Sequence, residues 1–341
     1  MNKKDGTRLP VALYLILLKY TDEKHIITMN GPGGIIERLQ AYGIEAERKT
    51  IYAARDILKE FGVQIHQVRM HSEQGYYMEH LFSPAEALVL LDTIAESSSL
   101  SVQESGELHQ KVSSLMSEYQ NRNLPEIFLS PSKTDNRQVL KNIEILMDAI
   151  SSHRSIRFLY YDLTVTDHAR TEKRYRKSST AYVTDPYGIT SGNGRFYCIC
   201  CSADHNTPAY YRIDKMEKLT ISDHVFKPVS FDIHEYVRRS IQMYSGHAQT
   251  VKARFSRKIA ANVFDEFGHD RRSIIITKVT SDTFEAAIRT TVTPTVTGWF
   301  LQFYQDAVIL EPQTFRDSLL HIAKTIERNY NTEKQEAHHE Q

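Results

Sequence analysis

The sequence has few of the residues that mark several common classes of protein. Three cysteines in 341 residues are too few for a disulfide framework, and all three lie between positions 198 and 201, so a reducing cytoplasm is the expected location. Lys plus Arg and Asp plus Glu both total 42, which gives a formal net charge of zero. That balance excludes a protein that binds nucleic acid through bulk positive charge. Any polyanion has to meet a local basic patch.

Long hydrophobic runs are also absent. The longest apolar segment, residues 11–18, is closed by Lys19 and is well short of the roughly 20 residues that a membrane span requires. Basic residues precede this run, as in a signal peptide, but charged residues follow it in place of a small-residue cleavage site. We interpret the run as the first helix of a buried core, and we expect no membrane partner.

The composition is otherwise that of a globular protein, and a polar segment divides the chain. Hydrophobic residues make up 41% and charged residues 25%, and the length leaves room for about two or three domains. Residues 119–137 include two prolines and many Ser, Asn and Thr residues, a composition typical of a linker. Before it, apolar residues recur at helical spacing. Helices are predicted there at residues 9–20, 35–42, 51–61, 84–95 and 102–119.

After the linker the pattern changes. One helix at residues 139–152 precedes a β-rich domain at about 156–222, where short segments rich in Tyr, Val, Ile and Thr are typical of strands. From residue 251 strands and helices are mixed, which predicts an α+β module, and the polar tail from residue 331 is expected to be frayed. The predicted fold class of the chain is α+β. In the last module, strands are predicted at residues 251–255, 274–279, 284–291 and 307–310, and helices at 258–267, 298–304 and 314–330.

Residues 35–77 have the spacing of a helix-turn-helix followed by a hairpin. A first helix ends at Gly43, a turn of three or four residues follows, and a second helix runs from about Arg48 to Phe61. Alternating apolar residues then predict the two strands of a wing, closed by a polar loop at 71–74. One face of the second helix is predicted to be buried. That apolar stripe is Ile51, Ala54, Ile57, Leu58 and Phe61.

The opposite arc of this second helix carries basic and hydrogen-bonding side chains, which suits duplex DNA. A helix fits the major groove, Arg and Lys can bond guanine edges, and a wing can contact neighbouring phosphates. The run from Arg48 to Leu58 resembles the recognition helix of bacterial winged helix-turn-helix repressors, although Glu47 stands where those proteins often place a serine cap. Many helical hairpins with basic surfaces bind nothing, however. The candidate DNA-binding residues are Arg48, Lys49, Thr50, Tyr52, Arg55 and Lys59.

Several segments of the β-rich domain, taken in order, are similar to the WYL domain. The Trp-Tyr-Leu strand of that family corresponds to Phe196, Tyr197 and Cys198, so that only the tyrosine is retained. Residues 298–304 and 308–312 resemble the C-terminal extension of WYL regulators. The resemblance implies a winged helix-turn-helix, a barrel like the Sm or SH3 fold, and a C-terminal α+β extension. The matching segments of the barrel are residues 156–161, 182–189, 195–199 and 210–216.

The resemblance also implies a function, namely a homodimeric bacterial transcriptional regulator. Its WYL domain would sense a nucleotide-like or nucleic-acid effector and change the affinity for a double-stranded DNA operator. Alternation along residues 210–214 places Tyr210, Arg212 and Asp214 on one face of a strand, and an arginine beside tyrosines can clamp a phosphate and stack a base. The candidate ligand-binding residues are Tyr160, Tyr182, Tyr197, Tyr211, Arg212 and Asp214.

Other interpretations of these residues stay open at this stage. Arg212 could pair with Asp214 while the tyrosines fill a small core. The basic run from Arg170 to Lys177 could be a solvated hairpin or could extend a nucleic-acid surface. An RNA-binding or RNA-processing accessory protein that uses its Sm-like barrel is the alternative to a DNA-binding regulator. The two helices at 84–95 and 102–119 would couple the domains or form part of the dimer.

No catalytic set of residues is recognisable, so we expect no enzyme, no metal and no cofactor. The cysteines are interpreted as buried small hydrophobic residues on a strand. The Ser-x-x-Lys sequence from Ser130 to Lys133 lies in the linker without its usual partner motifs and is attributed to chance. The expected domains are a DNA-binding domain at residues 1–82, a helical connector or dimerisation region at 83–153, a WYL domain at 154–224 and a C-terminal extension at 250–331.

Overall fold

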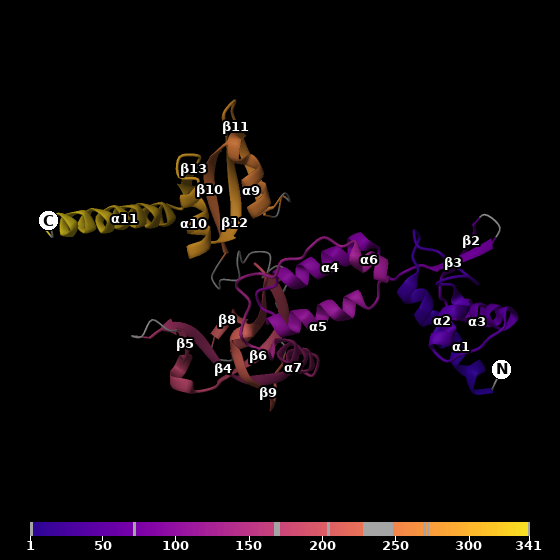
Figure 1. Cartoon of the computed structure of the whole chain (residues 1–341). Helices are drawn as coiled ribbons and strands as arrows, with labels where there is room; N and C mark the ends of the chain where they lie inside the picture. The colour runs from indigo at the N-terminus through magenta and orange to yellow at the C-terminus, as the bar shows by residue number, and fades with distance from the viewer. Residues whose placement is uncertain are drawn as a thin grey trace. The chain divides into compact units, whose positions relative to one another are not determined.

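The computed structural model describes residues 3–70, 73–166, 171–202, 205–227, 248–268, 271 and 273–339. The chain divides into two compact units, Met1–Arg137 and Gln138–Gln341, and each is described by itself (Figure 1). Helices and strands are mixed in both units, as the predicted α+β class requires. Among the described helices, none is long and apolar enough to cross a membrane.

Three helices and a small antiparallel sheet form the N-terminal end of the first unit, in the order predicted for a winged helix-turn-helix. The turn between the second and third helices depends on Gly43, whose φ of 68° lies in the left-handed region that favours glycine. Leu13, Ile16, Leu39 and Ile51 are among the buried residues of the shared core. The helices are α1 (Lys3–Tyr20), α2 (Ile35–Ala41) and α3 (Arg48–Glu60).

The sheet of this region is a hairpin with one short additional strand. The hairpin pairs Ile65 with Met78 and Val68 with Gly75, and the extra strand lies against its second strand. The predicted loop at 71–74 is too long, because the second strand already begins at Glu73; residues 71 and 72 lie outside the described residues. The strands are β1 (Ile27–Thr28), β2 (Ile65–Met70) and β3 (Glu73–Met78), in the order β1-β3-β2.

The apolar stripe predicted on α3 is only partly correct. Ile51 and Ala54 are buried and Leu58 packs against the core, but Ile57 is 43% and Phe61 83% exposed. At 100° per residue, Ile57 lies about 120° away from Ile51 around the helix, outside the arc that faces the core. Phe61 is the C-terminal cap residue and projects beyond the packed turns.

The remainder of the first unit is helical, and each helix begins at a serine cap. The hydroxyls of Ser83, Ser101 and Ser117 each accept a hydrogen bond from the backbone N–H three residues later, and a Glu or Gln side chain completes the capping box. The single helix predicted at 102–119 is therefore wrong, because Ser117 begins a new helix. The helices are α4 (Pro84–Glu96), α5 (Val102–Ser113) and α6 (Glu118–Arg122).

The first part of the second unit is a strongly bent antiparallel sheet with one helix against it (Figure 1). Asn193 and Gly194 both have positive φ, 50° and 68°, as a tight hairpin turn requires. Cys198 and Cys200 are buried, with their sulfur atoms 3.4 Å apart, which confirms their interpretation as core residues. The elements are α7 (Val139–Ser151), β4 (Arg154–Val165), β5 (Thr171–Tyr175), the 3-10 helix η1 (Arg176–Ser179), β6 (Tyr182–Gly192), β7 (Arg195–Ser202), β8 (His205–Arg212), the 3-10 helix η2 (Ile213–Lys215) and β9 (Met216–Val225). Their order in the sheet is β5-β4-β6-β7-β8, and β9 pairs with β4.

The last module packs its helices around an aromatic core. Phe255 lies 6.0 Å from Phe300 and 6.2 Å from Trp299, measured between ring centroids. The final helix continues to His339, so the expectation of a frayed tail from residue 331 is wrong for the residues up to 339. The elements are β10 (Ala248–Ser256), η4 (Arg257–Ile259), α9 (Ala260–Phe267), β11 (Ile274–Val279), β12 (Thr283–Thr291), α10 (Pro294–Gln302), β13 (Ala307–Glu311) and α11 (Gln313–His339), with the sheet order β11-β12-β10-β13.

Candidate nucleic-acid and ligand sites

The solvent-facing side of α3 carries most of the predicted DNA-binding residues. Arg48, Lys49 and Lys59 are exposed, and Thr50 and Tyr52 are half-buried at the border of the core. The helix thus begins with two exposed cations, where its dipole also favours anions. Within the described residues, the side chain of Glu47 makes no cap hydrogen bond, so the four N-terminal N–H groups of α3 are not occupied by that side chain.

Arg55 is held by neighbouring side chains, one of which is the candidate Tyr52. Its guanidinium donates to the carboxylate of Asp56 at 2.6 and 2.9 Å. It also lies 5.2 Å from the ring centroid of Tyr52 and 5.9 Å from that of Tyr76 on β3. The side chain is only 19% exposed. Arg55 therefore connects α3 with the β2–β3 hairpin, and it can reach a ligand only by leaving these partners.

Four aromatic rings form a cluster on one side of the bent sheet of the second unit. Phe158 is fully buried and stacks on Tyr182 at 5.6 Å with an interplanar angle of 11°. Tyr211 lies 5.3 Å from Phe158, 5.4 Å from Tyr160 and 5.5 Å from Tyr182. Burial raises the pKa of both Tyr160 and Tyr211 to about 12. Three of the six predicted ligand residues, Tyr160, Tyr182 and Tyr211, are thus brought together.

Cations from β5 and η1 lie over the tyrosine rings of this sheet. The ammonium of Lys173 lies 4.6 Å from the ring centroid of Tyr161, and the guanidinium of Arg176 lies 5.2 Å from that of Tyr160. Lys177 places its ammonium 4.2 Å from the centroid of Tyr182. Such contacts are attractive because the face of an aromatic ring is electron-rich. Three cations of the predicted basic run, Lys173, Arg176 and Lys177, thus contact tyrosine rings; Arg170 lies outside the described residues.

Asp162 on β4 anchors this basic segment. Its carboxylate accepts a hydrogen bond from Arg176 at 2.6 Å and another from Lys215 at 2.9 Å. The hydrogen bond from Arg176 lowers the pKa of Asp162 to about 2. The carboxylate is therefore ionised at neutral pH and fixes one end of η1 to the sheet.

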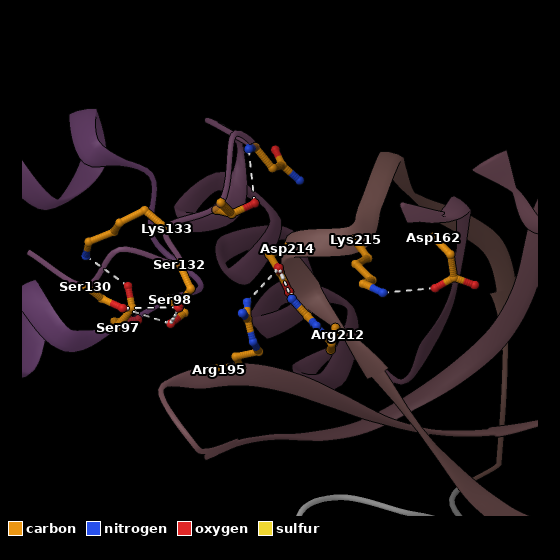
Figure 2. Close-up of polar contacts among 12 residues, drawn as sticks. Ser97, Ser98, Ser130, Ser132, Lys133, Asp162, Arg195, Arg212, Asp214 and Lys215 are labelled. Atoms are coloured by element: carbon orange, nitrogen blue, oxygen red, sulfur yellow. Dashed lines mark hydrogen bonds and ion pairs between the residues drawn. The ribbon is translucent and has the colours of Figure 1, made fainter. Parts of the chain in front are cut away.

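A second cluster is built around the buried carboxylate of Asp214 (Figure 2). Arg212 donates to it twice, at 3.1 and 2.6 Å, and Arg195 donates at 3.4 Å. Burial lowers the pKa of Arg195, and the neighbouring charge of Arg212 lowers it further. Two guanidiniums share one carboxylate, which leaves a net positive charge beside a partly exposed surface. Arg195 was missed in the sequence because only cross-strand pairing brings it to Asp214.

The predicted strand at 210–214 is wrong at its end. The strand β8 stops at Arg212, and Ile213 to Lys215 form a 3-10 turn, which returns the carboxylate of Asp214 towards Arg212 as a fork-to-fork pair. Tyr197 lies opposite Arg212 in the ladder between β7 and β8. Tyr197, Arg212 and Asp214 thus form one group, and the aromatic cluster forms another. The backbone N–H of Arg212 connects the groups by donating to the hydroxyl of Tyr160 at 3.1 Å.

The Ser-x-x-Lys sequence has a structural role. The ammonium of Lys133 donates to the carbonyl of Ser97 at 2.9 Å (Figure 2). It also donates to the carbonyl of Ile94 at 2.9 Å and to the hydroxyl of Ser105 at 2.7 Å. Burial lowers the pKa of Lys133. The serine of the motif, Ser130, is buried, and its hydroxyl lies 3.3 Å from that of Ser98 and 3.2 Å from that of Ser132. Lys133 therefore ties the linker to the C-terminal end of α4, where a cation is favourable.

Two family models match the second unit. The WYL domain matches residues 141–221, and the WCX domain matches residues 247–326. No curated protein matches the chain. Among solved structures, the proteasome accessory factor B/C (PafBC) of Arthrobacter aurescens is similar over 92% of this chain and 47% of that chain, with 17% sequence identity and a TM-score of 0.28. The chain thus spans about half the length of that protein.

Proposed function

The chain carries a WYL domain followed by a WCX domain and is a WYL-domain protein; from this premise we propose that it is a transcriptional regulator that binds duplex DNA. The observation that carries the proposal is the exposed basic face of α3 beside a β2–β3 hairpin. A helix of this kind enters the major groove, and a hairpin beside it contacts the flanking phosphates. A chain with no net charge needs such a local basic surface to hold DNA.

The residues proposed to touch DNA have different roles. Arg48 and Lys49, exposed in the first turn of α3, supply cations to phosphates or guanine edges. Tyr52 and Lys59 lie on the same side of the helix as Arg48, whereas Thr50 lies on the other side of the helix, at the border of the core. Arg55 orients the β2–β3 hairpin through Tyr76 and joins the DNA contact only when it leaves Asp56.

The WYL domain is proposed to sense an anionic, nucleotide-like or nucleic-acid effector. Arg195 and Arg212 supply guanidiniums that can clamp a phosphate, and the cluster of Tyr160, Tyr182 and Tyr211 supplies aromatic faces for a base. Effector binding would change the affinity for an operator, in a protein that acts as a homodimer in the cytoplasm. The support is that both kinds of group lie in one domain, where the backbone N–H of Arg212 in the phosphate-binding group donates to the hydroxyl of Tyr160 in the base-stacking group at 3.1 Å.

The test is a pull-down of genomic fragments with the full chain, followed by gel shifts on the recovered duplex over a salt series. We expect a discrete site and a steep salt dependence. Lys49→Ala should weaken binding and reduce the salt slope by about one, and Arg48→Ala should cost about 1 to 3 kcal/mol if a base contact is lost. Lys258→Ala, an exposed cation of the C-terminal module, is the control and should change nothing. Unchanged affinity in a variant lacking both Arg48 and Lys49 would refute the proposed DNA contact.

One observation favours a second function, that of an RNA-binding accessory protein. Lys173, Arg176 and Lys177 lie over tyrosine rings of the bent sheet, and a basic surface with aromatic faces suits single-stranded RNA. Competition separates the two functions. Duplex DNA should displace a bound operator fragment more effectively than single-stranded RNA if α3 is the main nucleic-acid surface.

A further inference from the structure

The short helix η1, which we call the strap (Arg176–Ser179), has an unusual backbone. Lys177, Ser178 and Ser179 have φ angles of 52°, 49° and 67°, and ψ is 36° at Lys177 and 43° at Ser178. Three consecutive residues with side chains are thus left-handed, a conformation that such residues normally adopt only singly. Strain of this kind persists where surrounding contacts hold it, and it is common at ligand clamps and switches.

Contacts with the tyrosine cluster hold the strap in place. Arg176 is fixed by the carboxylate of Asp162 at 2.6 Å and lies over the ring of Tyr160. Lys177 is exposed, and its ammonium lies over the ring of Tyr182 at 4.2 Å. An exposed cation–π contact is weak. The strap therefore has one firm anchor, Arg176, and one replaceable contact, Lys177.

Tyr182 has aromatic neighbours that belong to the cluster and one neighbour, Lys177, that can be replaced. One face of its ring stacks on Phe158, which is fully buried and cannot leave without opening the core. The ammonium of Lys177 lies over the ring as well, on a side chain that can swing into solvent. Removal of Lys177 would expose an aromatic face, and such a face stacks on any nucleobase.

We propose that the strap is a displaceable cover over a stacking site on Tyr182, and that its ligand is a nucleobase that carries a phosphate. The base takes the place of Lys177 on the ring, and the displaced ammonium pairs with the phosphate. A base without a phosphate displaces the ammonium of Lys177 but gives it no new partner. A phosphate without a base can pair with that ammonium but leaves the ring of Tyr182 uncovered. The inference rests on the proposed sensing role of the WYL domain and names the part of the domain that would move.

The first arm of the test needs no ligand. Hydrogen exchange is measured on the full chain, in peptides that cover residues 171–182. Ser178 is exposed, so its replacement leaves the core intact. Ser178→Asn, which tolerates the left-handed conformation, should slow exchange about five-fold, and Ser178→Val, which resists it, should accelerate exchange by a similar factor. Asn193→Val, at another exposed left-handed residue (φ 50°) in the turn between β6 and β7, is the matched control and should leave these peptides unchanged.

The second arm uses a fluorescein-labelled single-stranded DNA octamer, with inorganic pyrophosphate and adenosine as separate competitors. We expect Ser178→Val to bind the octamer more tightly than the natural chain does. Ser178→Asn and Lys177→Gln should bind it more weakly. Neither pyrophosphate nor adenosine alone should displace the octamer efficiently. If the octamer binds but the Ser178 variants change neither hydrogen exchange nor affinity, the proposed displacement of the strap is refuted. The proposed sensing role of the WYL domain then stands. If neither the natural chain nor Ser178→Val binds the octamer, both the ligand named here and the proposed sensing role fail.

Discussion

Replacing Asp22 with alanine is expected to loosen the joint between the N-terminal helices and α6. Asp22 follows α1, and its carboxylate is almost fully buried. One oxygen accepts hydrogen bonds from the backbone N–H groups of Lys24 and His25, both at 2.9 Å, and from the His25 ring at 2.8 Å. The other accepts the hydroxyl of Ser117 at 2.6 Å. Ser117 is the cap of α6, so one carboxylate joins two segments that are 95 residues apart in sequence.

The expected cost follows from the number and type of these bonds. A hydrogen bond to a charged group contributes about 1.5 to 3 kcal/mol, but the loss is smaller where water can take its place. The side chain of His25 is 35% exposed, and the two backbone N–H groups are partly accessible. We therefore estimate that Asp22→Ala lowers the local stability by about 3 kcal/mol, which is less than the sum over the lost hydrogen bonds. Asp22→Asn should cost about 1 to 2 kcal/mol, because neutral acceptors bond more weakly. Ser117→Ala removes one bond and should cost about 1 to 2 kcal/mol.

The stability of this joint should also depend on pH. Burial alone would raise the pKa of Asp22, but the hydrogen bonds from Ser117, His25 and Lys24 outweigh that effect and lower it. A carboxyl group whose pKa is lower in the folded state contributes stability that is fully present above its unfolded pKa, near 3.9, and is lost as the pH falls through the folded value. The effect of Asp22→Ala should therefore shrink in acid and be constant around neutral pH.

Local hydrogen exchange is the appropriate assay, because a chain of several domains has no single unfolding free energy. Peptides that cover residues 19–27 and 114–122 should exchange faster in Asp22→Ala than in the natural chain, while those of the second unit should not change. Asp223→Ala is the control, since Asp223 is fully exposed and pairs with Arg154 in the second unit. Unchanged exchange in both N-terminal peptides would refute the argument, as would a coupling energy near zero in the double-mutant cycle of Asp22 with Ser117.

Three further substitutions test other parts of the structure. Lys133→Met should destabilise α4 by about 2 kcal/mol, because two carbonyls and the hydroxyl of Ser105 lose a charged donor; unchanged hydrogen exchange in peptides that cover residues 92–105 would contradict this. Phe158→Ala should cost about 3 to 5 kcal/mol by leaving a cavity under the tyrosine cluster, measured as a lower midpoint of the second unit; a loss below 1 kcal/mol would mean that the ring is not core. The carboxyl of Asp162 should titrate near its pKa of about 2. Its ion pairs with Arg176 and Lys215 should contribute about 1 kcal/mol to stability after solvent screening, and this contribution should persist above pH 4 and disappear as the pH falls towards 2. Carbon NMR of the carboxyl in the natural chain and in Arg176→Gln tests this, and a value near 4 in both would be inconsistent with the pairing.

The parts of the fold that could be predicted from sequence are those fixed by local pattern. The helix α7 was predicted at 139–152 and is found at Val139–Ser151, and β11 was predicted at 274–279 and is found there. In α7 the helical period agrees with the residues that are buried. In β11 only Ile274 is buried, and the strand was found from its β-branched residues. The burial of Cys198 and Cys200 follows from the same local reasoning. The resemblance to WYL and WCX sequences is confirmed, because it too rests on segments in sequence order.

The parts of the fold that were not predicted either have a local signal that a stronger pattern hides or have no local signal. The break between α5 and α6 has a local signal, the capping box of Ser117 and Gln120, but the apolar Leu115 and Met116 hid it by continuing the helical spacing. The left-handed strap has no sequence signal at all, since Lys177, Ser178 and Ser179 are ordinary exposed residues. Side-chain contacts of Arg176 and Lys177 with distant residues, and not propensity, hold its conformation.

The division of the predicted ligand residues into two groups has a chemical consequence. In the structure each candidate binding group is already occupied by another part of the domain: the carboxylate of Asp214 occupies the guanidinium of Arg212, and the ammonium of Lys177 covers Tyr182. A ligand must therefore replace internal contacts of similar strength, so its net affinity is the difference between two sets of interactions. A base alone displaces the ammonium of Lys177 from Tyr182 without giving it a new partner, and a phosphate alone does not stack on the ring. A ligand that carries both groups stacks on Tyr182 and pairs with the displaced ammonium, and this favours a nucleotide or a short nucleic acid over either of its components.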